Sequence, residues 1–429
     1  MLLAPHRFAL VMALAISTVS LSPAYARGEF DYLHHHSQPD DTEDAEWYEV
    51  PAVDTPRLDG YLIQKATSYN GLQVAAVLDP ALADLMEAEL TSEDEKALDE
   101  IADALTGEPG GMGAALEQLA GSQNANLAAA TQNTTQQLGS QLLSTLHTLP
   151  DTDEGHFWTK GVRNEGRLAR QGGSAGLNTD TQGLMLGADW ALGQAWHVGV
   201  MGAKTSSRFD TQRFDADLDS WHVGGYAVRR DGPLALRLGG IYSRHTGTNK
   251  RRIQLLDHAE QLKGSYDAQS QTLFSELGYQ LGSAGFSAEP FIGLGYQRYH
   301  RDSFKERGGL AALNVGSQTQ QNLNSTVGLR LATEYRFDHQ VSVTPYLSTR
   351  WKHLYGAVDS QVRQSYRHTP GLIDDFTIIG TSLDRDSLDL QAGLDLALSA
   401  QHTVGLSYSG QAGSNSRNQG LMGQWTMSF

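Results

Sequence analysis

The chain of 429 residues contains no cysteine, so it offers neither a disulfide framework nor a thiolate for metal binding or nucleophilic chemistry. Beyond residue 26 it also lacks any apolar run of the roughly 20 residues that a membrane-spanning helix needs. Asp, Glu, Lys and Arg are absent from residues 118–150, although the formal net charge of the whole chain is −17. These absences exclude thiol chemistry and helical spans, and they mark residues 118–150 as an unusual segment.

The charge of the chain is concentrated near its amino end. Residues 27–120 hold 22 acidic and four basic side chains, whereas residues 155–429 hold 24 acidic and 27 basic ones. This contrast predicts two segments in different environments rather than one acidic protein with a basic partner. We expect a short acidic leader at residues 27–111, with one capped amphipathic helix at residues 91–105 and mostly disordered chain elsewhere.

The first 26 residues have the pattern of a secretory signal peptide. Arg7 precedes the apolar run at residues 8–16, and Ala24 and Ala26 form the small-x-small pattern that signal peptidase cleaves. We expect the mature chain to begin at Arg27. The alternative is an uncleaved membrane anchor, but the apolar run is shorter than a spanning helix needs.

Residues 112–150 are predicted to form a long helix. Leucines recur there at spacings near multiples of the helical turn, at Leu116, Leu119, Leu127, Leu138, Leu142 and Leu146. A surface helix normally carries Glu and Lys on its exposed side, so an uncharged polar helix indicates a helix threaded through a polar lumen. About 20 helical residues cover roughly 30 Å, the thickness of the apolar layer of a membrane. The alternative is a flexible linker rich in Gln and Asn.

From residue 155 onward the chain is a succession of segments in which apolar and polar residues alternate. Alternation with a period of two predicts strands with one apolar and one polar face. The twelve segments are residues 156–164, 183–190, 196–205, 220–228, 234–242, 273–281, 289–299, 327–335, 343–353, 387–398, 403–408 and 419–429. Twelve is an even number, as bacterial single-chain barrels have. The fold class predicted is therefore all-β, a 12-stranded antiparallel transmembrane β-barrel.

The connections between these segments favour a membrane barrel over a soluble β-sandwich. The chain turns at once after the even-numbered segments and takes longer paths after the odd-numbered ones, of which residues 355–385 are the longest. Outer-membrane barrels have short periplasmic turns and long outer loops, whereas a sandwich has no reason to alternate its loops in this way. Both ends of the barrel are then expected on the periplasmic side.

The same alternation assigns residues to the lipid and the lumen. Leucines such as Leu394 are expected to face lipid, and the polar residues between them are expected to line the lumen. The predicted lumen lining includes Arg237, Glu276, Arg330, Glu334, Asp389 and Asp395. At the carboxyl end one apolar face is predicted to hold Leu421, Trp425, Met427 and Phe429.

Several motifs resemble the β-domain of autotransporters. They lie at residues 157–161, 187–190, 289–296, 393–398 and 405–410. The helical region adds a short Leu-x-x-Leu-x-Gly signature, from Leu116 to Gly121. A strand that ends on Phe429 also resembles the assembly signal of outer-membrane barrels, with Leu421, Trp425 and Met427 on its apolar face.

This resemblance implies type V secretion, in which a barrel in the outer membrane exports its own amino-terminal segment. The domains expected are a signal peptide at 1–26, a leader or passenger at 27–111, a helical linker at 112–150 and the barrel at 151–429. The partners expected are outer-membrane lipid, the barrel-assembly machinery, periplasmic chaperones and the chain's own amino-terminal segment. No nucleic acid, cofactor, metal or catalytic residue is expected.

Two other classes of function remain open. One is a helix-plugged channel without an exported passenger, and the other is an enzyme embedded in the barrel. The sequence holds no Gly-x-Ser-x-Gly nucleophile motif, which argues against the enzyme. The adjacent residues His34, His35 and His36 are not expected to form a closed metal site. Asn124, Asn126 and Asn133 form no Asn-Asn junction of the kind that some family members cleave, so we expect the leader to stay attached.

Overall fold

The computed structural model describes residues 60–86, 111–149, 154–193, 195–255, 258–283, 285–337, 341–370 and 373–429. The expected signal cleavage at Ala24 and Ala26, the histidines at 34–36, the helix at 91–105 and the leader before residue 60 lie outside these residues. Within the described ranges, no helix is both long and apolar enough to cross a membrane.

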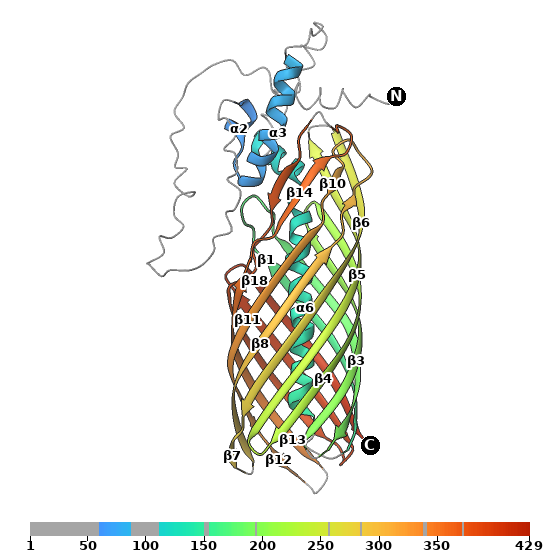
Figure 1. The fold of residues 1–429 in the computed structure, drawn as a ribbon, viewed down its shortest axis with the longest axis vertical. Helices are drawn as coiled ribbons and strands as arrows, with labels where there is room; N and C mark the ends of the chain where they lie inside the picture. The colour runs from blue at the N-terminus through green and yellow to red at the C-terminus, as the bar shows by residue number, and fades with distance from the viewer. Residues whose placement is uncertain are drawn as a thin grey trace, which may run out of the picture.

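Twelve long antiparallel strands close into a barrel, which confirms the predicted fold class (Figure 1). Each strand pairs with the next one along the chain, and the last pairs with the first, so that the sheet forms a ring. The twelve strands are β1 (His156–Leu168), β2 (Leu177–Leu192), β3 (Trp196–Thr211), β4 (Phe214–Asp231), β5 (Leu234–Leu255), β6 (His258–Tyr279), β8 (Phe286–Arg301), β11 (Gln318–Thr333), β13 (Ser342–Gly356), β16 (Asp386–Ala397), β17 (His402–Gly413) and β18 (Ser416–Ser428).

The outside of the barrel carries an apolar belt between two rings of aromatic side chains. Exposed leucines and valines make up the belt, Leu394 among them. One ring contains Trp190, Tyr279, Phe286, Tyr335 and Phe429, and the other contains Trp221, Tyr242, Trp351, Tyr355 and Tyr408. Leu421 on β18 and Phe429 just after its end face outward, whereas Met422, Thr426 and Ser428 are buried. An apolar band between two aromatic girdles is the surface of a barrel that sits in lipid.

The two ends of the barrel are built differently. We call the end that holds the start of β1, the end of β18 and the short turns after β2, β4 and β16 the turn rim. The short strands β7 (Leu281–Ser283) and β12 (Tyr335–Arg336) extend the wall at this end. The opposite end, which we call the loop rim, carries the longer connections at residues 169–176, 302–317 and 357–385.

The expectation of long loops after β3, β5 and β17 is wrong. Only two residues separate each of these strands from the next, because the strands continue far beyond the apolar belt. In this part of β5 the outward-facing residues are polar, for example Arg244, Lys250 and Arg252. Buried and exposed positions still alternate along these parts of the strands, but most residues at both kinds of position are polar. A pattern of apolar and polar residues cannot detect such a strand.

A small helical and sheet body covers the loop rim. Strands β9 (Phe304–Lys305), β10 (Leu313–Val315), β14 (Gln361–Tyr366) and β15 (Phe376–Ile379) form a second sheet. Helices α2 (Tyr61–Lys65), α3 (Tyr69–Met86) and α5 (Gly111–Ala120) pack beside it. The leader was predicted to be mostly disordered, and the structure corrects this for residues 60–86, which bury apolar side chains such as Leu62 and Val74.

Two polar residues fasten this helical body. The buried side chain of Asn70 donates to the carbonyl of Ile379 and accepts from its N–H, both at 2.8 Å, so it docks α3 on the edge of β15. The carboxylate of Asp79 accepts from the N–H groups of Leu62 and Ile63 at the start of α2, at 2.8 and 3.1 Å. Partial burial raises the pKa of Asp79, although these two hydrogen bonds act in the opposite direction.

Helix α6 (Gln123–Thr148) runs inside the barrel from the loop rim to the turn rim (Figure 1). Its 26 residues span about 39 Å at 1.5 Å per residue. The predicted single helix over residues 112–146 is instead two helices, since Gly121, with a φ of 58°, ends α5 outside the lumen. A side chain at Gly121 would meet Leu313 and Arg251, so glycine suits both the backbone and the space.

Candidate functional site in the plugged lumen

Helix α6 presents two different stripes to the barrel. Gln132, Gln136, Ser140 and Ser144 follow one another at intervals of four residues, as do Leu138, Leu142 and Leu146. Positions 140 and 142 lie about 200° apart around the axis, because each helical residue turns by about 100°. The polar stripe and the leucine stripe therefore occupy opposite faces of α6, which we call the plug because it fills the lumen.

The leucine stripe packs on one side of the lumen, which we call the apolar wall. This wall is formed by inward-facing side chains of β18 and β1–β5 near the turn rim, namely Trp158, Val162, Met185, Met201, Ala203, Tyr226, Val228, Ile241 and Met422. Leu142 and Leu146 have no exposed surface, and Leu138 is 3% exposed. The lumen was predicted to be polar throughout, but this side of it is a hydrophobic core.

The polar stripe faces the other side, which we call the polar wall: Gln297 on β8, Gln320 on β11, Arg350 and Lys352 on β13, and Gln391 on β16. Gln132 donates to Gln320 at 2.5 Å, and Gln136 donates to Gln297 at 2.9 Å. Lys352 donates to Gln136 at 2.9 Å, and Gln391 donates to Ser144 at 2.8 Å. A cavity of about 70 Å³ remains between this stripe and the wall, lined by polar side chains that include Ser140, Arg350 and Asp389.

A buried ion cluster holds the carboxyl end of α6 at the turn rim. The Nε2 atom of His147 lies 2.8 Å from the carboxylate of Glu276, and its Nδ1 atom lies 3.6 Å from that of Glu289. Arg237 reaches the same two carboxylates at 3.2 and 2.7 Å. Arg230 donates to the carbonyl of Leu149 at 2.8 Å, which satisfies one of the unpaired carbonyls at the helix end. The predicted lumen residues Arg237 and Glu276 thus contact the plug.

The other four predicted lumen residues have different surroundings. Arg330 lies over the ring of Tyr346 at 4.2 Å, and Asp389 lines the polar cavity. Asp395 interacts electrostatically with Arg330 and with Lys160, whose ammonium donates to the carbonyl of Gln141 at 3.1 Å. Glu334 is instead part of the turn before β12, where it pairs with Arg336. Hydrogen bonds that Arg336 donates to the carboxylate lower the pKa of Glu334.

A second lock lies at the loop rim, where α5 gives way to α6. Arg251 forms a buried bidentate pair with Glu306 and donates to the carbonyl of Gln118 at 2.9 Å. Gln364 donates to the carbonyl of Ala120 at 2.8 Å. Arg301 donates to the carbonyl of Asn124 at 2.8 Å. Arg251 and Gln364 thus satisfy carbonyls that the end of α5 leaves unpaired, and Arg301 adds a donor at the first turn of α6.

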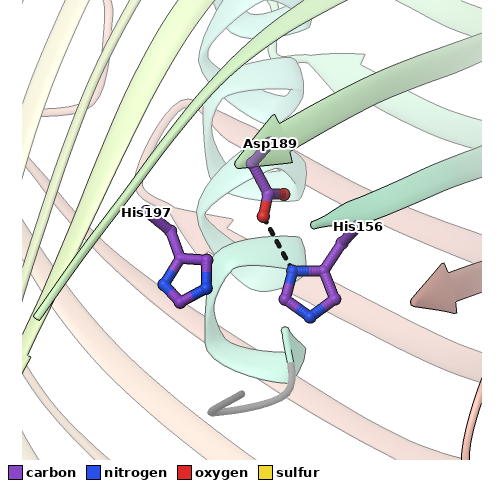
Figure 2. A group of neighbouring side chains, drawn as sticks. All are labelled: His156, Asp189 and His197. Atoms are coloured by element: carbon purple, nitrogen blue, oxygen red, sulfur yellow. Dashed lines mark hydrogen bonds and ion pairs between the residues drawn. The ribbon is translucent and has the colours of Figure 1, made fainter. Parts of the chain in front are cut away.

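One group of possible metal ligands lies on the inner face at the turn rim. Within the described residues, His156, Asp189 and His197 form the one set whose ligand atoms all lie within 4.8 Å of one another (Figure 2). His156 Nδ1 is 2.7 Å from Asp189 Oδ1. Asp189 Oδ2 accepts from Tyr226 at 2.9 Å, and the Tyr226 oxygen accepts from Trp158 at 2.7 Å.

Sequence reasoning missed most of these residues. His147 lies in the segment without Asp, Glu, Lys or Arg, so the sequence gives no sign that it contacts charged groups. In the structure it contacts the carboxylates of Glu276 and Glu289 on the barrel wall. Arg251, Arg301 and Glu306 fall in segments that were interpreted as loops. His156 is the first and His197 the second residue of its predicted strand, and the polar parity of those strands is the signal for an inward direction.

The fold and the site define a class: an outer-membrane β-barrel whose lumen is closed by a helix that precedes the first strand. A model of the autotransporter β-domain family matches residues 157–409, which is more than half of the chain. The chain belongs to this family.

Individual relatives agree with this assignment. Two proteins of Serratia marcescens, each named extracellular serine protease, are 31% and 30% identical over 278 residues, which is 65% of this chain. The chain spans about a quarter of their length, 26% in both cases. The translocator domain of the autotransporter NalP from Neisseria meningitidis has the same fold, with a TM-score of 0.57, 16% identity, and coverage of 71% of this chain and 99% of that one.

Family membership shows the compartment, and the layout of short turns and longer loops gives the orientation. The protein is a translocator domain of type V secretion in the outer membrane of a Gram-negative envelope. The turn rim, which holds the start of β1 and the end of β18, faces the periplasm, and the loop rim faces outward. The resemblance and the compartment expected from the sequence are confirmed.

Proposed function

We propose that this barrel displays its own amino-terminal segment at the cell surface and keeps it attached. The observation that carries the proposal is the direction of α6, which enters at the loop rim and ends beside the periplasmic start of β1 (Figure 1). The chain before α6 is therefore already on the outer side of the barrel. Helices α2, α3 and α5 pack there as a folded body rather than trailing from the pore.

The contacts of the plug favour a finished export product over an open channel. The leucine stripe, the ion cluster at His147 and the lock at Arg251 fix α6 at the middle and at both ends. A channel needs a continuous wet path, but the cavity beside α6 is only about 70 Å³. The helix-plugged channel with a periplasmic leader is the competing function, and the location of the leader separates the two.

The absence of cysteine provides a clean test of this location. Gln64→Cys places a thiol on exposed α2, and Arg336→Cys places one at the periplasmic rim. A membrane-impermeant maleimide should label Gln64→Cys in intact cells and Arg336→Cys only after the outer membrane is permeabilised. Protection of both thiols in intact cells would identify the channel with a periplasmic leader and overturn display.

We also propose that the described part of the chain is not an enzyme, although relatives are named as proteases. The lumen does contain serine–histidine pairs: Ser220 lies 2.7 Å from His245 Nδ1, and Ser243 lies 2.7 Å from His222 Nδ1. The second nitrogen of each ring contacts another hydroxyl, on Ser270 and Thr205. The carboxylate that orients the base in a catalytic triad therefore has no place at either ring. A fluorophosphonate probe should leave the purified protein unlabelled, and labelling of Ser220 or Ser243 would overturn this proposal.

The barrel-assembly machinery and periplasmic chaperones are proposed as partners because the terminal strand offers a defined contact surface. Phe429 exchanges two backbone hydrogen bonds with Gly155, of 2.9 and 3.0 Å, and its ring is exposed on the outer surface. Deletion of Phe429 should leave the chain unassembled in the periplasm. A normal amount of heat-modifiable barrel in the outer membrane would show that this residue is not a recognition signal.

A further inference from the structure

We propose that His156, Asp189 and His197 form a binding site for a divalent transition-metal ion, with Zn²⁺ as the fitting member of that class. The three side chains come from three consecutive strands, β1, β2 and β3, and all point to the lumen side of the wall (Figure 2). Two imidazoles and one carboxylate are the ligand types of zinc sites with three protein ligands. Such nitrogen-rich sets favour zinc over the hard ions Mg²⁺ and Ca²⁺.

The distances suit an ion after small side-chain rotations. Ligand atoms around a tetrahedral zinc lie about 3.3 Å apart, which follows from bond lengths of about 2.0–2.1 Å. The three ligand groups already lie within 4.8 Å of one another. The imidazole centroids of His156 and His197 are 5.4 Å apart, and the rings are inclined by 38°. Rotation about χ2 is the movement by which both rings would turn toward a common ion.

The surroundings hold the ligands in place, as metal sites require. His156 and Asp189 have no exposed surface, and His197 is 8% exposed. Asp189 Oδ2 is held by the hydroxyl of Tyr226, and Asp189 Oδ1 lies 2.7 Å from His156 Nδ1, so a bound ion would replace this direct contact. Trp158 fixes that hydroxyl in turn. Carboxylates that bind metal ions are in turn hydrogen-bonded in this way, which fixes their orientation.

The position of the site gives the ion a structural role. His156 is the first residue of β1, where it pairs with Ser428 of β18 and with Asp189 of β2. Residues 149–155 connect it to the end of α6. An ion shared by β1, β2 and β3 would anchor the junction between the plug and the wall, beside the seam at which the first and last strands meet. It would do so at the periplasmic rim, where His197 keeps the small exposed surface of the site.

The test uses the full chain in detergent, with His34, His35 and His36 replaced by alanine so that zinc cannot bind there. After chelation and dialysis, one equivalent of Zn²⁺ per chain should bind and raise the unfolding temperature. His197→Gln should weaken binding by about 10-fold or more, since it removes one of three ligands. His353→Gln is the matched control, because His353 pairs with Asp386 at 2.8 Å but is not part of the ligand group.

Two results would overturn the proposal: no stoichiometric binding in the parent, or equal affinity in the parent and His197→Gln. If His197→Gln does not assemble, Co²⁺ bound to the parent decides the question. Intense visible bands of tetrahedral cobalt that disappear when Zn²⁺ is added support the site. A weak octahedral spectrum means that the ion is held by water at the surface and contradicts it.

Discussion

The two walls of the lumen hold the same helix by different physical means. Against the apolar wall, three leucines of α6 are buried, and each contributes about 1.5–3 kcal/mol relative to exposure. Against the polar wall, glutamine and serine side chains form hydrogen bonds whose net contribution is about 0.5–1.5 kcal/mol each. The apolar wall therefore supplies most of the retention of the plug, and the polar wall sets its rotation and keeps one side hydrated.

This difference explains how the lumen can be packed tightly around α6 and still have allowed the amino-terminal segment to pass through it earlier. An entirely apolar bore would expose a large hydrophobic surface to water whenever the helix was absent, whereas an entirely polar bore would hold the helix weakly. The apolar contacts are concentrated on β18 and β1–β5. The inner faces of β8, β11, β13 and β16 can therefore remain hydrated. The ion cluster at His147 and the lock at Arg251 then fix the depth of the helix.

The largest effect is expected when both sets of contacts are removed together. Deletion of residues 123–148 should convert small, brief openings in a planar bilayer into a large and steady conductance. The reason is that a 12-stranded bore with a polar wall remains hydrated once its helix is gone. Equal conductance in the intact and deleted proteins would mean that α6 does not close the pore.

Single substitutions on opposite faces of α6 separate the contributions of the two walls. Leu142→Ala leaves a cavity against the apolar wall and should cost about 2–5 kcal/mol of stability. Ser144→Ala removes one hydrogen bond to Gln391 and should cost about 0.5–1.5 kcal/mol. The loss of stability in each variant can be measured as the fall in the temperature at which α6 becomes sensitive to protease in detergent. The comparison of walls fails if the serine variant is the more damaged of the two.

The third prediction compares the outside of the barrel with its polar lumen. Leu394→Arg places a cation in the lipid belt and should cost about 2–4 kcal/mol of folding free energy. Gln391→Lys, on the same strand, enters the polar cavity beside Asp389, which has a buried oxygen without a hydrogen-bond partner among the described residues. Its cost should stay below about 1.5 kcal/mol. Heat modifiability of the two variants gives the ranking, and equal damage would mean that the faces are assigned incorrectly.

The sequence predicts the parts of the fold that depend on local alternation. Leu394 and Leu421 were assigned to the outer face from period-two patterns, and twelve such segments predicted the number of strands. The same rule fails beyond the lipid belt, where Arg244 and Lys250 lie on a regular strand that is polar on both faces. There the pairing comes from backbone hydrogen bonds and from the neighbouring strand, which a single sequence does not reveal.

The candidate site was harder to predict because its contacts join distant parts of the chain. A helix over most of residues 112–150 could be predicted from its leucines and its lack of charge. Its division into two walls could not, because it depends on which strand faces which side of the helix. Glu306 meets Arg251 only after a loop folds over the rim. His156, Asp189 and His197 meet through the register of three strands.

The smallest expected change in conductance belongs to Gln136, which joins α6 to two strands of the polar wall at once. It donates to Gln297 at 2.9 Å and accepts from Lys352 at 2.9 Å. Gln136→Ala removes both contacts but leaves the leucine stripe intact, so the stability should fall by about 0.5–1.5 kcal/mol for the bond to Gln297 and by about 1.5–3 kcal/mol for the bond from Lys352. The cavity on this side would also grow and admit more water, because its lining stays polar. We therefore expect a small rise in bilayer conductance from Gln136→Ala and none from the matched change Gln137→Ala, whose side chain also borders the cavity but does not form these bonds. A rise of the same size in both variants would mean that added volume, rather than the bridge at Gln136, controls leakage along the polar wall.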